Sequence, residues 1–167
     1  MKRHSSAASL ALFVLAVLGI SAPAAAGELV PLRARFEGSF TVTPVNPPST
    51  IFDIRTSATG NASHFGRFTM ERLGRIDRST ATLVGTASFT LKAANGDTVY
   101  GTGTGQASPT PTPGVLASVE TYTITGGTGR FAGATGAFVV QRLTNKITLT
   151  DTGTLTGSIS SPGAANP

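Results

Sequence analysis

Apolar and polar residues alternate one by one along most of the chain, and this period of two is the feature that most limits its fold. From Leu32 to Val42 every second residue is apolar or glycine, and the residues between them are charged or hydroxylic. Residues 81–91 follow the same pattern apart from Val84. Such alternation sends successive side chains to opposite faces of a β-strand. No segment after residue 27 keeps a helical period of 3.6 residues over three turns, so the sequence predicts an all-β protein.

The pattern divides into eight strands that are separated by short breaks. We expect strands at residues 30–43, 50–58, 63–74, 80–93, 97–107, 115–125, 134–143 and 152–160. Asn95-Gly96 lies in one break and is the strongest short indication of a tight hairpin. Short connections favour antiparallel neighbours, and eight antiparallel strands in one small domain favour a closed up-and-down barrel. A sandwich of two sheets is the competing architecture.

The first 26 residues have the organisation of a secretory signal peptide. A charged head, Met1–His4, precedes an apolar run from Leu10 to Ile20, and Ala24 and Ala26 form an A-x-A cleavage site. The apolar run is too short for an ordinary membrane-spanning helix, which needs about 20 residues. We therefore expect cleavage after Ala26, a secreted or periplasmic barrel domain at 27–160 without a stable membrane anchor, and a disordered tail at 161–167.

Composition excludes several kinds of chemistry. The chain has no cysteine, which excludes disulfides, thiol catalysis and cysteine-ligated zinc. His64 is the one histidine after the signal peptide, and a metal site would need further ligands, so we expect no metal and no cofactor. The formal net charge falls from +5 to +3 once Lys2 and Arg3 are removed, and no run of five basic residues exists. We therefore expect no nucleic-acid partner. The densest basic group, Arg67 to Arg78, fits a solvated strand edge better than a binding patch.

A glycine-rich segment, Gly126–Gly136, carries the most conspicuous motif. Gly127-x-Gly129-x-x-Ala132 matches a relaxed dinucleotide-binding fingerprint, but that mechanism needs a helix next, and the residues that follow have the pattern of a strand. We therefore predict a structural turn in which the glycines allow a sharp change of direction and an aromatic side chain anchors the loop in the core. The residues of this turn are Gly126, Gly127, Gly129, Phe131 and Gly133.

The same segment carries a family resemblance. Gly126–Gly136 resembles a turn between late barrel strands of dirigent proteins and allene oxide cyclases, and of a group of secreted bacterial barrel proteins. Residues 60–69 are similar to a second block of those bacterial proteins. The resemblance implies an eight-stranded antiparallel barrel with a small hydrophobic lumen. It also implies homo-oligomers, since plant members are often trimers. No catalytic residue of these families is carried over.

Polar residues in the middle of expected strands are the candidate ligand-binding groups. Glu71 and Glu120 are mid-strand carboxylates, and buried carboxylates have shifted pKa values and can polarise a ligand. The alternative is a surface Glu–Arg pair across two strands. For His64 the alternatives are catalysis and a hydrogen bond at a strand end or turn. The candidate lining comprises Glu71, Glu120, Tyr100, Tyr122, Arg67, Arg142 and His64.

Three functions are compatible with these features. The first is an exported barrel that binds a small hydrophobic ligand in its lumen. The second is an allene-oxide-cyclase-like or dirigent-like enzyme or auxiliary protein that acts on a small apolar substrate in the same lumen. The third is a structural secreted protein whose barrel is filled by phenylalanines: Phe36, Phe40, Phe68, Phe89, Phe131 and Phe138.

Overall fold

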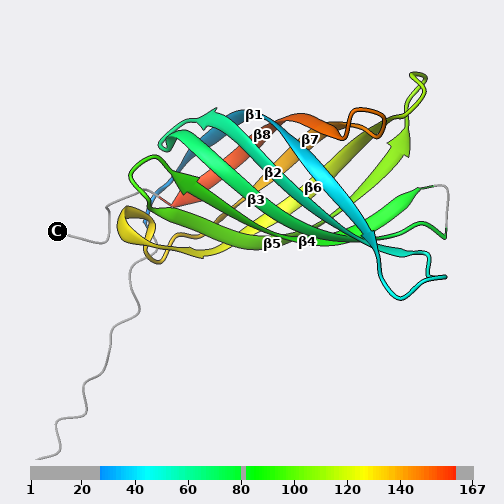
Figure 1. Ribbon diagram of the computed structural model, residues 1–167. Coiled ribbons are helices and arrows are strands. Elements are labelled where there is room, and N and C mark those ends of the chain that lie inside the picture. The colour runs from blue at the N-terminus through cyan, green and yellow to red at the C-terminus, as the bar shows by residue number, and fades with distance from the viewer. Residues whose placement is uncertain (1–26, 80–81, 161–167) are drawn as a thin grey trace, which may run out of the picture.

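The structure is a computed structural model that describes residues 27–79 and 82–160. The expected signal peptide and the expected C-terminal tail both lie outside the described residues. Within them the chain forms eight strands and one short 3-10 helix, η1 (Figure 1). The strands are β1 (Leu29–Pro44), β2 (Ile51–Ala62), β3 (Gly66–Asp77), β4 (Leu83–Ala93), β5 (Thr98–Pro109), β6 (Val115–Gly127), β7 (Gly136–Asn145) and β8 (Thr150–Ser160), and η1 is Gly129–Phe131.

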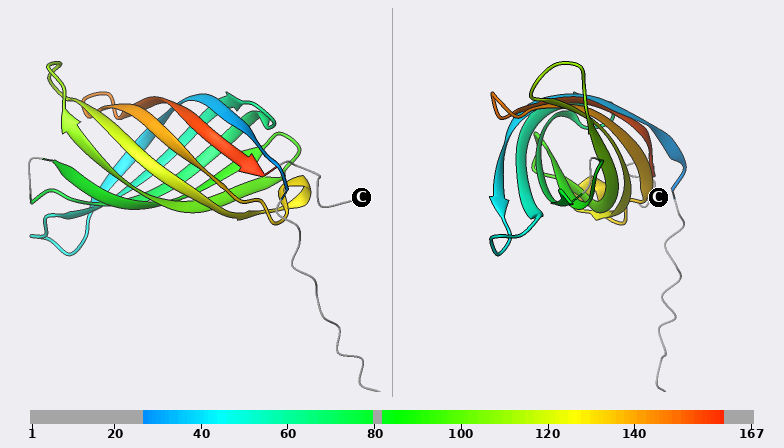
Figure 2. Two further views of the ribbon diagram at one scale, coloured as in Figure 1. Left: turned by 180° about the vertical axis from the view of Figure 1, so that it is seen from behind. Right: turned by 90° about the vertical axis from the view of Figure 1, so that its right-hand side faces the viewer.

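The eight strands close into one barrel in sequence order. Each strand pairs antiparallel with the next, and β1 pairs with β8 to complete the circle. The all-β, up-and-down barrel predicted from the sequence is therefore confirmed, and the two-sheet sandwich is excluded. Closure leaves no unpaired sheet edge among these strands, which removes a site where other chains could add a strand. The right-hand view in Figure 2, taken along the barrel, shows the strands as a ring.

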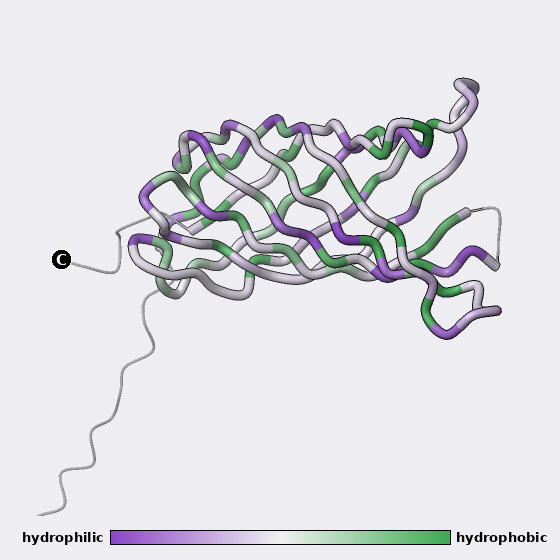
Figure 3. Tube along the Cα trace, in the orientation of Figure 1, coloured by the Kyte–Doolittle hydropathy of each residue, from purple (hydrophilic) through white to green (hydrophobic). Residues whose placement is uncertain are grey.

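The alternating sequence pattern places apolar side chains in the lumen and polar side chains on the outer surface. On β1, for example, Leu32, Ala34, Phe36 and Phe40 are buried, whereas the residues between them are exposed or partly exposed. Figure 3 shows the resulting change between hydrophobic and hydrophilic colour along several of the strands. Burial of this apolar set is the main favourable contribution to the stability of such a barrel.

Glycines inside the strands make room for the large side chains of the lumen. An added Cβ at Gly103 would lie 2.5 Å from the Tyr122 ring, and one at Gly153 would lie 2.6 Å from the Phe36 ring. Both distances are too short for non-bonded carbon atoms. A narrow eight-stranded barrel has space for a large side chain only if a neighbouring inward position is small. These glycines therefore serve packing, as glycines in strand interiors commonly do.

The two ends of the barrel differ. At one end, the loop between β6 and β7 folds inward as η1, and Phe131 stacks on Phe65 with ring centroids 4.3 Å apart. Both rings are almost fully buried, so they close this end of the lumen. At the other end lie the connections β1–β2, β3–β4, β5–β6 and β7–β8 (Figure 1). We call this second end the mouth.

Only part of the glycine-rich segment forms a turn, because Gly126 and Gly127, which were expected in the turn, are the last residues of β6. Gly129 has φ +56° and Gly133 has φ +72°, values that L-residues with side chains rarely adopt. Strand β7 follows, with no α-helix to hold a pyrophosphate.

Two sequence expectations about the β2–β3 region are wrong. The break expected between the strands 50–58 and 63–74 includes Gly60 and Asn61, but both belong to β2, which continues to Ala62. Gly60 faces inward because an added Cβ would lie 2.6 Å from the Phe68 ring. The glycine is therefore a packing residue, and its presence does not mark a turn.

The turn lies at residues 63–65 instead, before β3 begins at Gly66. His64 has φ +67°, so it belongs to the turn and not to a strand. The strand expected at 63–74 would have sent Ser63 and His64 to opposite faces, but both side chains contact the same atom. Ser63 Oγ and His64 Nε2 each lie 3.1 Å from the carbonyl oxygen of Pro31.

Candidate functional site

A cavity of about 250 Å³ occupies the part of the lumen next to the mouth. All eight strands contribute to its wall. Its apolar lining comes from Phe40, Val42, Ile54, Ile76, Leu83, Ala87, Ala107, Pro109 and Leu116. The deeper half of the lumen, toward η1, is filled by the buried core, which includes Phe89, Phe138, Leu91 and Ile124. The lumen is therefore open at the mouth and filled at the opposite end.

Glu120 is the centre of a buried polar cluster at the inner end of this cavity, which we call its floor. Tyr122 donates a hydrogen bond of 2.6 Å from its hydroxyl to Glu120 Oε2. Arg142 Nη2 lies 2.9 Å from the same oxygen, and Arg72 Nη2 lies 3.1 Å from Oε1. Arg72 also donates from Nε to the Tyr122 hydroxyl over 2.7 Å. Strands β3, β6 and β7 thus meet at a single carboxylate.

Asp151 extends the same cluster to β8 and β2. Its Oδ2 accepts a hydrogen bond of 3.2 Å from Arg142 Nη1 and one of 3.3 Å from Thr56 Oγ1. Its Oδ1 accepts a hydrogen bond of 2.5 Å from Thr144 Oγ1. Both carboxylates are therefore paired through all their oxygens, and Arg142 joins them.

The charged groups of the cluster are buried, and their opposite charges are equal in number. The side chains of Arg72, Glu120, Arg142 and Asp151 are each at most 8% exposed. Two guanidinium groups face two carboxylates, so the formal charge of the cluster is zero. Buried charges require this kind of pairing, because an isolated charge in the lumen would carry a large desolvation cost. Among the described side chains, Arg142 Nε is the one completely buried polar atom without a hydrogen-bond partner.

Burial also perturbs the titration of two members of the cluster. Burial raises the pKa of Tyr122 to about 12, and the nearby Arg72 guanidinium opposes this shift only in part. For Arg72, burial acts to lower the pKa, but the Glu120 carboxylate and then Tyr122 more than offset it, so the pKa is raised. Tyr122 is consequently a protonated hydrogen-bond donor at neutral pH, and Arg72 is a permanent cation.

Ser118 supplies a hydroxyl of a different kind. It faces the lumen on β6, two residues before Glu120, and it lines the cavity. The residue is 8% exposed, and its hydroxyl has no hydrogen-bond partner among the described residues. A hydroxyl can both donate and accept a hydrogen bond. Ser118 is therefore available to a guest in the cavity, whereas the charged groups of the cluster already have partners.

Three of the seven residues proposed from the sequence as ligand-binding groups lie together in the lumen. They are Glu120, Tyr122 and Arg142. Inward and outward side chains alternate along β6 and β7, and all three residues lie on the inward face with Ile124 and Val140. The structure adds Arg72 and Asp151, which the sequence analysis did not include. Arg72 lies on the same strand face as the buried Phe68 and Met70, and this spacing was a usable indication.

The other four residues lie outside the lumen. Arg67, Glu71 and Tyr100 are exposed on the outer faces of β3 and β5. Glu71 accepts hydrogen bonds of 2.8 and 2.9 Å from Ser57 Oγ, a cross-strand contact with β2. His64 lies in the β2–β3 turn at the closed end. The structure therefore does not bring these four residues to the cavity.

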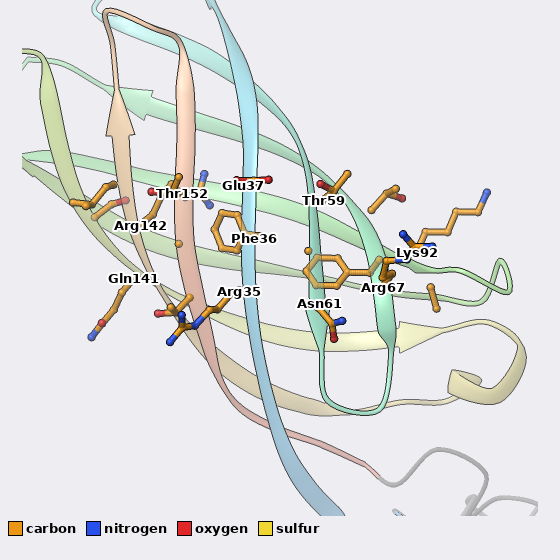
Figure 4. Close-up of a pocket in the computed structure, with 18 of the residues that line it drawn as sticks. Arg35, Phe36, Glu37, Thr59, Asn61, Arg67, Lys92, Gln141, Arg142 and Thr152 are labelled. Carbon is orange, nitrogen blue, oxygen red and sulfur yellow. The ribbon is translucent and has the colours of Figure 1, made fainter.

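A second, wider depression of about 1400 Å³ lies on the outer surface of the barrel (Figure 4). We call it the outer groove. It crosses the outward faces of β6, β7, β8, β1, β2 and β3 and reaches the end of β4. Its outward-facing residues include Arg35, Glu37, Thr59, Asn61, Arg67, Thr69, Lys92, Val119, Gln141, Leu143, Thr152 and Thr154. It is open and shallow, whereas the lumen cavity is smaller and enclosed by the barrel wall.

No group of three or more metal-binding side chains occurs among residues 27–79 and 82–160. In the same ranges no helix is long and apolar enough to cross a membrane.

Comparison with known proteins shows a likeness of fold. No protein-family model matches the sequence, and no curated protein is similar to it. A solved structure of a pterocarpan synthase dirigent protein superimposes on this chain with a TM-score of 0.51 and 13% sequence identity. The match covers 89% of this chain and 97% of the dirigent protein chain. A likeness at this identity concerns the fold. The described barrel, closed from β1 to β8, therefore has a dirigent-like fold.

Proposed function

We propose that the protein binds a small, largely apolar molecule in the cavity at the mouth of its barrel. The observation that carries this proposal is the cavity itself, which is about 250 Å³ in volume, open at one end and bounded by a mainly apolar surface. Ligand pockets for drug-sized molecules usually measure about 300–1,000 Å³. A dry apolar cavity of about 150 Å³ is sufficient for benzene. The volume therefore fits a compound of one or two rings.

The floor of the cavity supports binding more than catalysis. A general acid or base must exchange a proton with the substrate. Glu120 and Asp151 instead accept hydrogen bonds from guanidinium and hydroxyl groups on all their oxygens. Tyr122 is a poor proton donor at neutral pH because its pKa is raised to about 12. The cluster thus acts as a rigid floor, and Ser118 provides a hydrogen bond for one polar group of the guest.

A ligand screen with matched variants tests the proposal. One- and two-ring alcohols, ketones and hydrocarbons would be screened by thermal shift, and dissociation constants would be measured by calorimetry. Ala87→Leu places three more carbon atoms in the cavity, while Ser88→Leu makes a similar change on the outer face of the same strand. We expect Ala87→Leu to weaken binding at least about tenfold, which corresponds to ~1.4 kcal/mol, and Ser88→Leu to leave it unchanged.

Ala107→Leu near the mouth serves as a second cavity variant if Ala87→Leu lowers stability too far. Absence of binding across the screen, or equal affinity in the cavity variants and Ser88→Leu, would contradict the proposal. In that case the filled-barrel function is the better one.

Export by the signal peptide remains part of the proposal. The supporting observation is the sequence of residues 1–26, which lie outside the described residues. The barrel begins at Leu29, two residues after Gly27, so cleavage after Ala26 would leave every strand intact. Expression in a bacterial host with N-terminal sequencing of the exported fraction tests this step. Recovery of a chain that begins at Met1 would contradict it.

A further inference from the structure

The outer surface of the barrel is divided by charge. Within strands β5 to β8 the charged residues are Glu120, Arg142 and Asp151, and all three face the lumen. The outward faces of these four strands consequently carry no charge and are rich in threonine. The outward charges of the strands belong to β1 through β4. The outer groove crosses from the neutral part into the charged part.

Three cations lie in the charged part of the groove. Arg35 on β1 is paired in register with Asn61 on β2, and Asn61 is paired in turn with Arg67 on β3. Lys92 on β4 is opposite Thr69, two residues beyond Arg67. With a strand spacing of about 4.8 Å, Arg35 and Arg67 are roughly 10 Å apart across the sheet. Figure 4 shows their side chains together with that of Lys92 around the depression.

These cations have no ionic partner among the described residues. Two other surface arginines are paired: Arg75 lies 2.7 Å from Asp53, and Arg130 lies 3.7 Å from Asp97. In contrast, neither Arg35 nor Arg67 forms an ion pair or a side-chain hydrogen bond with any described residue, and the same holds for Lys92. Glu37 is the one carboxylate in the described groove lining. The groove therefore has a net positive charge and free donors.

The neutral groups of the groove are amides and hydroxyls. Asn61 and Gln141 present planar amides, and Thr59, Thr69 and Thr154 present hydroxyls. Such groups donate and accept hydrogen bonds with sugar hydroxyls. The aromatic residues of the lining, Phe36 and Phe68, lie in the core and face the lumen. The groove thus offers spaced positive charge and hydrogen bonds without an outward stacking surface.

We propose that the outer groove binds an acidic polysaccharide. Carboxylates on such a chain would pair with Arg35, Arg67 and Lys92, and its hydroxyls would meet the amides and threonines between them. A nucleic acid fits less well, since its bases require stacking partners and the outward face of the groove offers none. The proposal is independent of the lumen cavity and goes beyond the function proposed for it.

A charge-matched pair of double variants tests this site. Arg35→Gln/Arg67→Gln removes two cations from the groove. Arg33→Gln/Arg55→Gln removes two exposed cations from the same outer faces of β1 and β2, but outside the groove. The probes are polygalacturonate, a neutral dextran of similar length and a single-stranded oligonucleotide. Affinity would be measured by calorimetry or surface-based binding in low and physiological salt, with thermal melting to check that each variant is folded.

We expect the protein to bind polygalacturonate and not dextran, with affinity that falls as salt is raised. The groove variant should lose at least about tenfold in affinity, while the control variant keeps it. Equal losses in the two double variants would show that net charge alone is responsible and would overturn the proposal. Absence of polygalacturonate binding, or tighter binding of the oligonucleotide, would overturn it as well.

Discussion

Replacement of Glu120 by glutamine should destabilise the barrel far more than the same change at Glu71. Glu120 accepts hydrogen bonds from Arg72, Tyr122 and Arg142 in the lumen. Glutamine has nearly the same shape, but one of its two polar atoms becomes a donor. That donor would face the donors already present, and the two guanidinium groups would then share only the Asp151 carboxylate.

The magnitude follows from burial and from the number of lost interactions. A hydrogen bond to a charged group contributes about 1.5–3 kcal/mol, and two such bonds from guanidinium groups are affected. Removal of one partner from a buried ion pair typically costs about 3–5 kcal/mol because it leaves a buried charge uncompensated. We therefore expect Glu120→Gln to lower the free energy of unfolding by about 3–5 kcal/mol. The melting temperature should fall by roughly 10–20 °C.

Urea denaturation followed by circular dichroism measures this change, and Glu71→Gln is the matched control. Glu71 is also mid-strand and also accepts hydrogen bonds, but it is on the exposed outer face of β3. Surface substitutions of this kind usually change stability by less than about 0.5 kcal/mol. If both variants lose the same small amount, the lumen cluster is hydrated or loosely held, and the rigid floor inferred for the cavity is incorrect.

Two further predictions concern Tyr122 and the glycine-rich turn. The Tyr100→Phe variant keeps Tyr122 as its one tyrosine, and its tyrosinate absorbance should appear at about pH 12. Because the folded pKa is raised above the ordinary value of 10.0, the stability that Tyr122 contributes is complete below about pH 10. It should be lost between about pH 10 and 12, a decrease of roughly 2–3 kcal/mol; ionisation near pH 10 in the folded protein would contradict the burial argument. At the turn, Gly133→Ala should lower stability by about 1–2 kcal/mol for its positive φ alone. Gly129→Ala should lower it more in urea denaturation, because its Cβ would also overlap the Asp97 carboxylate, and equal losses would show that this carboxylate moves aside.

The barrel could be predicted from the sequence because alternation is a local property that survives in every strand. The pattern predicted all eight strands in their observed order, and short connections predicted antiparallel pairing. Turn positions were harder to predict, because glycine has two uses in a narrow barrel. Gly96, with φ +94°, serves a turn, as expected from Asn95-Gly96. Gly60 serves packing beneath Phe68, and composition alone does not separate these two uses.

The candidate site was predicted only in part, because alternation indicates which residues face inward but not which charged residues are paired. Alternation along β6 brings Glu120 and Tyr122 to the same face as buried Ile124. Arg72 has the same relation to Met70, but its place in a group of basic residues suggested a solvated edge. Asp151 was assigned to a break because the strand was expected to begin at 152, whereas β8 begins at Thr150. Contacts between distant strands decide which charged residues are paired, and a single sequence does not reveal them.

The position of the charges in β5 to β8 links the stability of the barrel to its selectivity. A lumen charge is tolerated only with a partner, and Arg142 finds Glu120 on one neighbouring strand and Asp151 on the other. This pairing fixes the floor before any guest enters. A guest therefore gains little by approaching Glu120 or Asp151, since it would have to replace existing bonds. Its affinity should come mainly from contact with the apolar wall and from a hydrogen bond with Ser118. Shape and one hydrogen bond should therefore select the ligand, and charge at the floor should not.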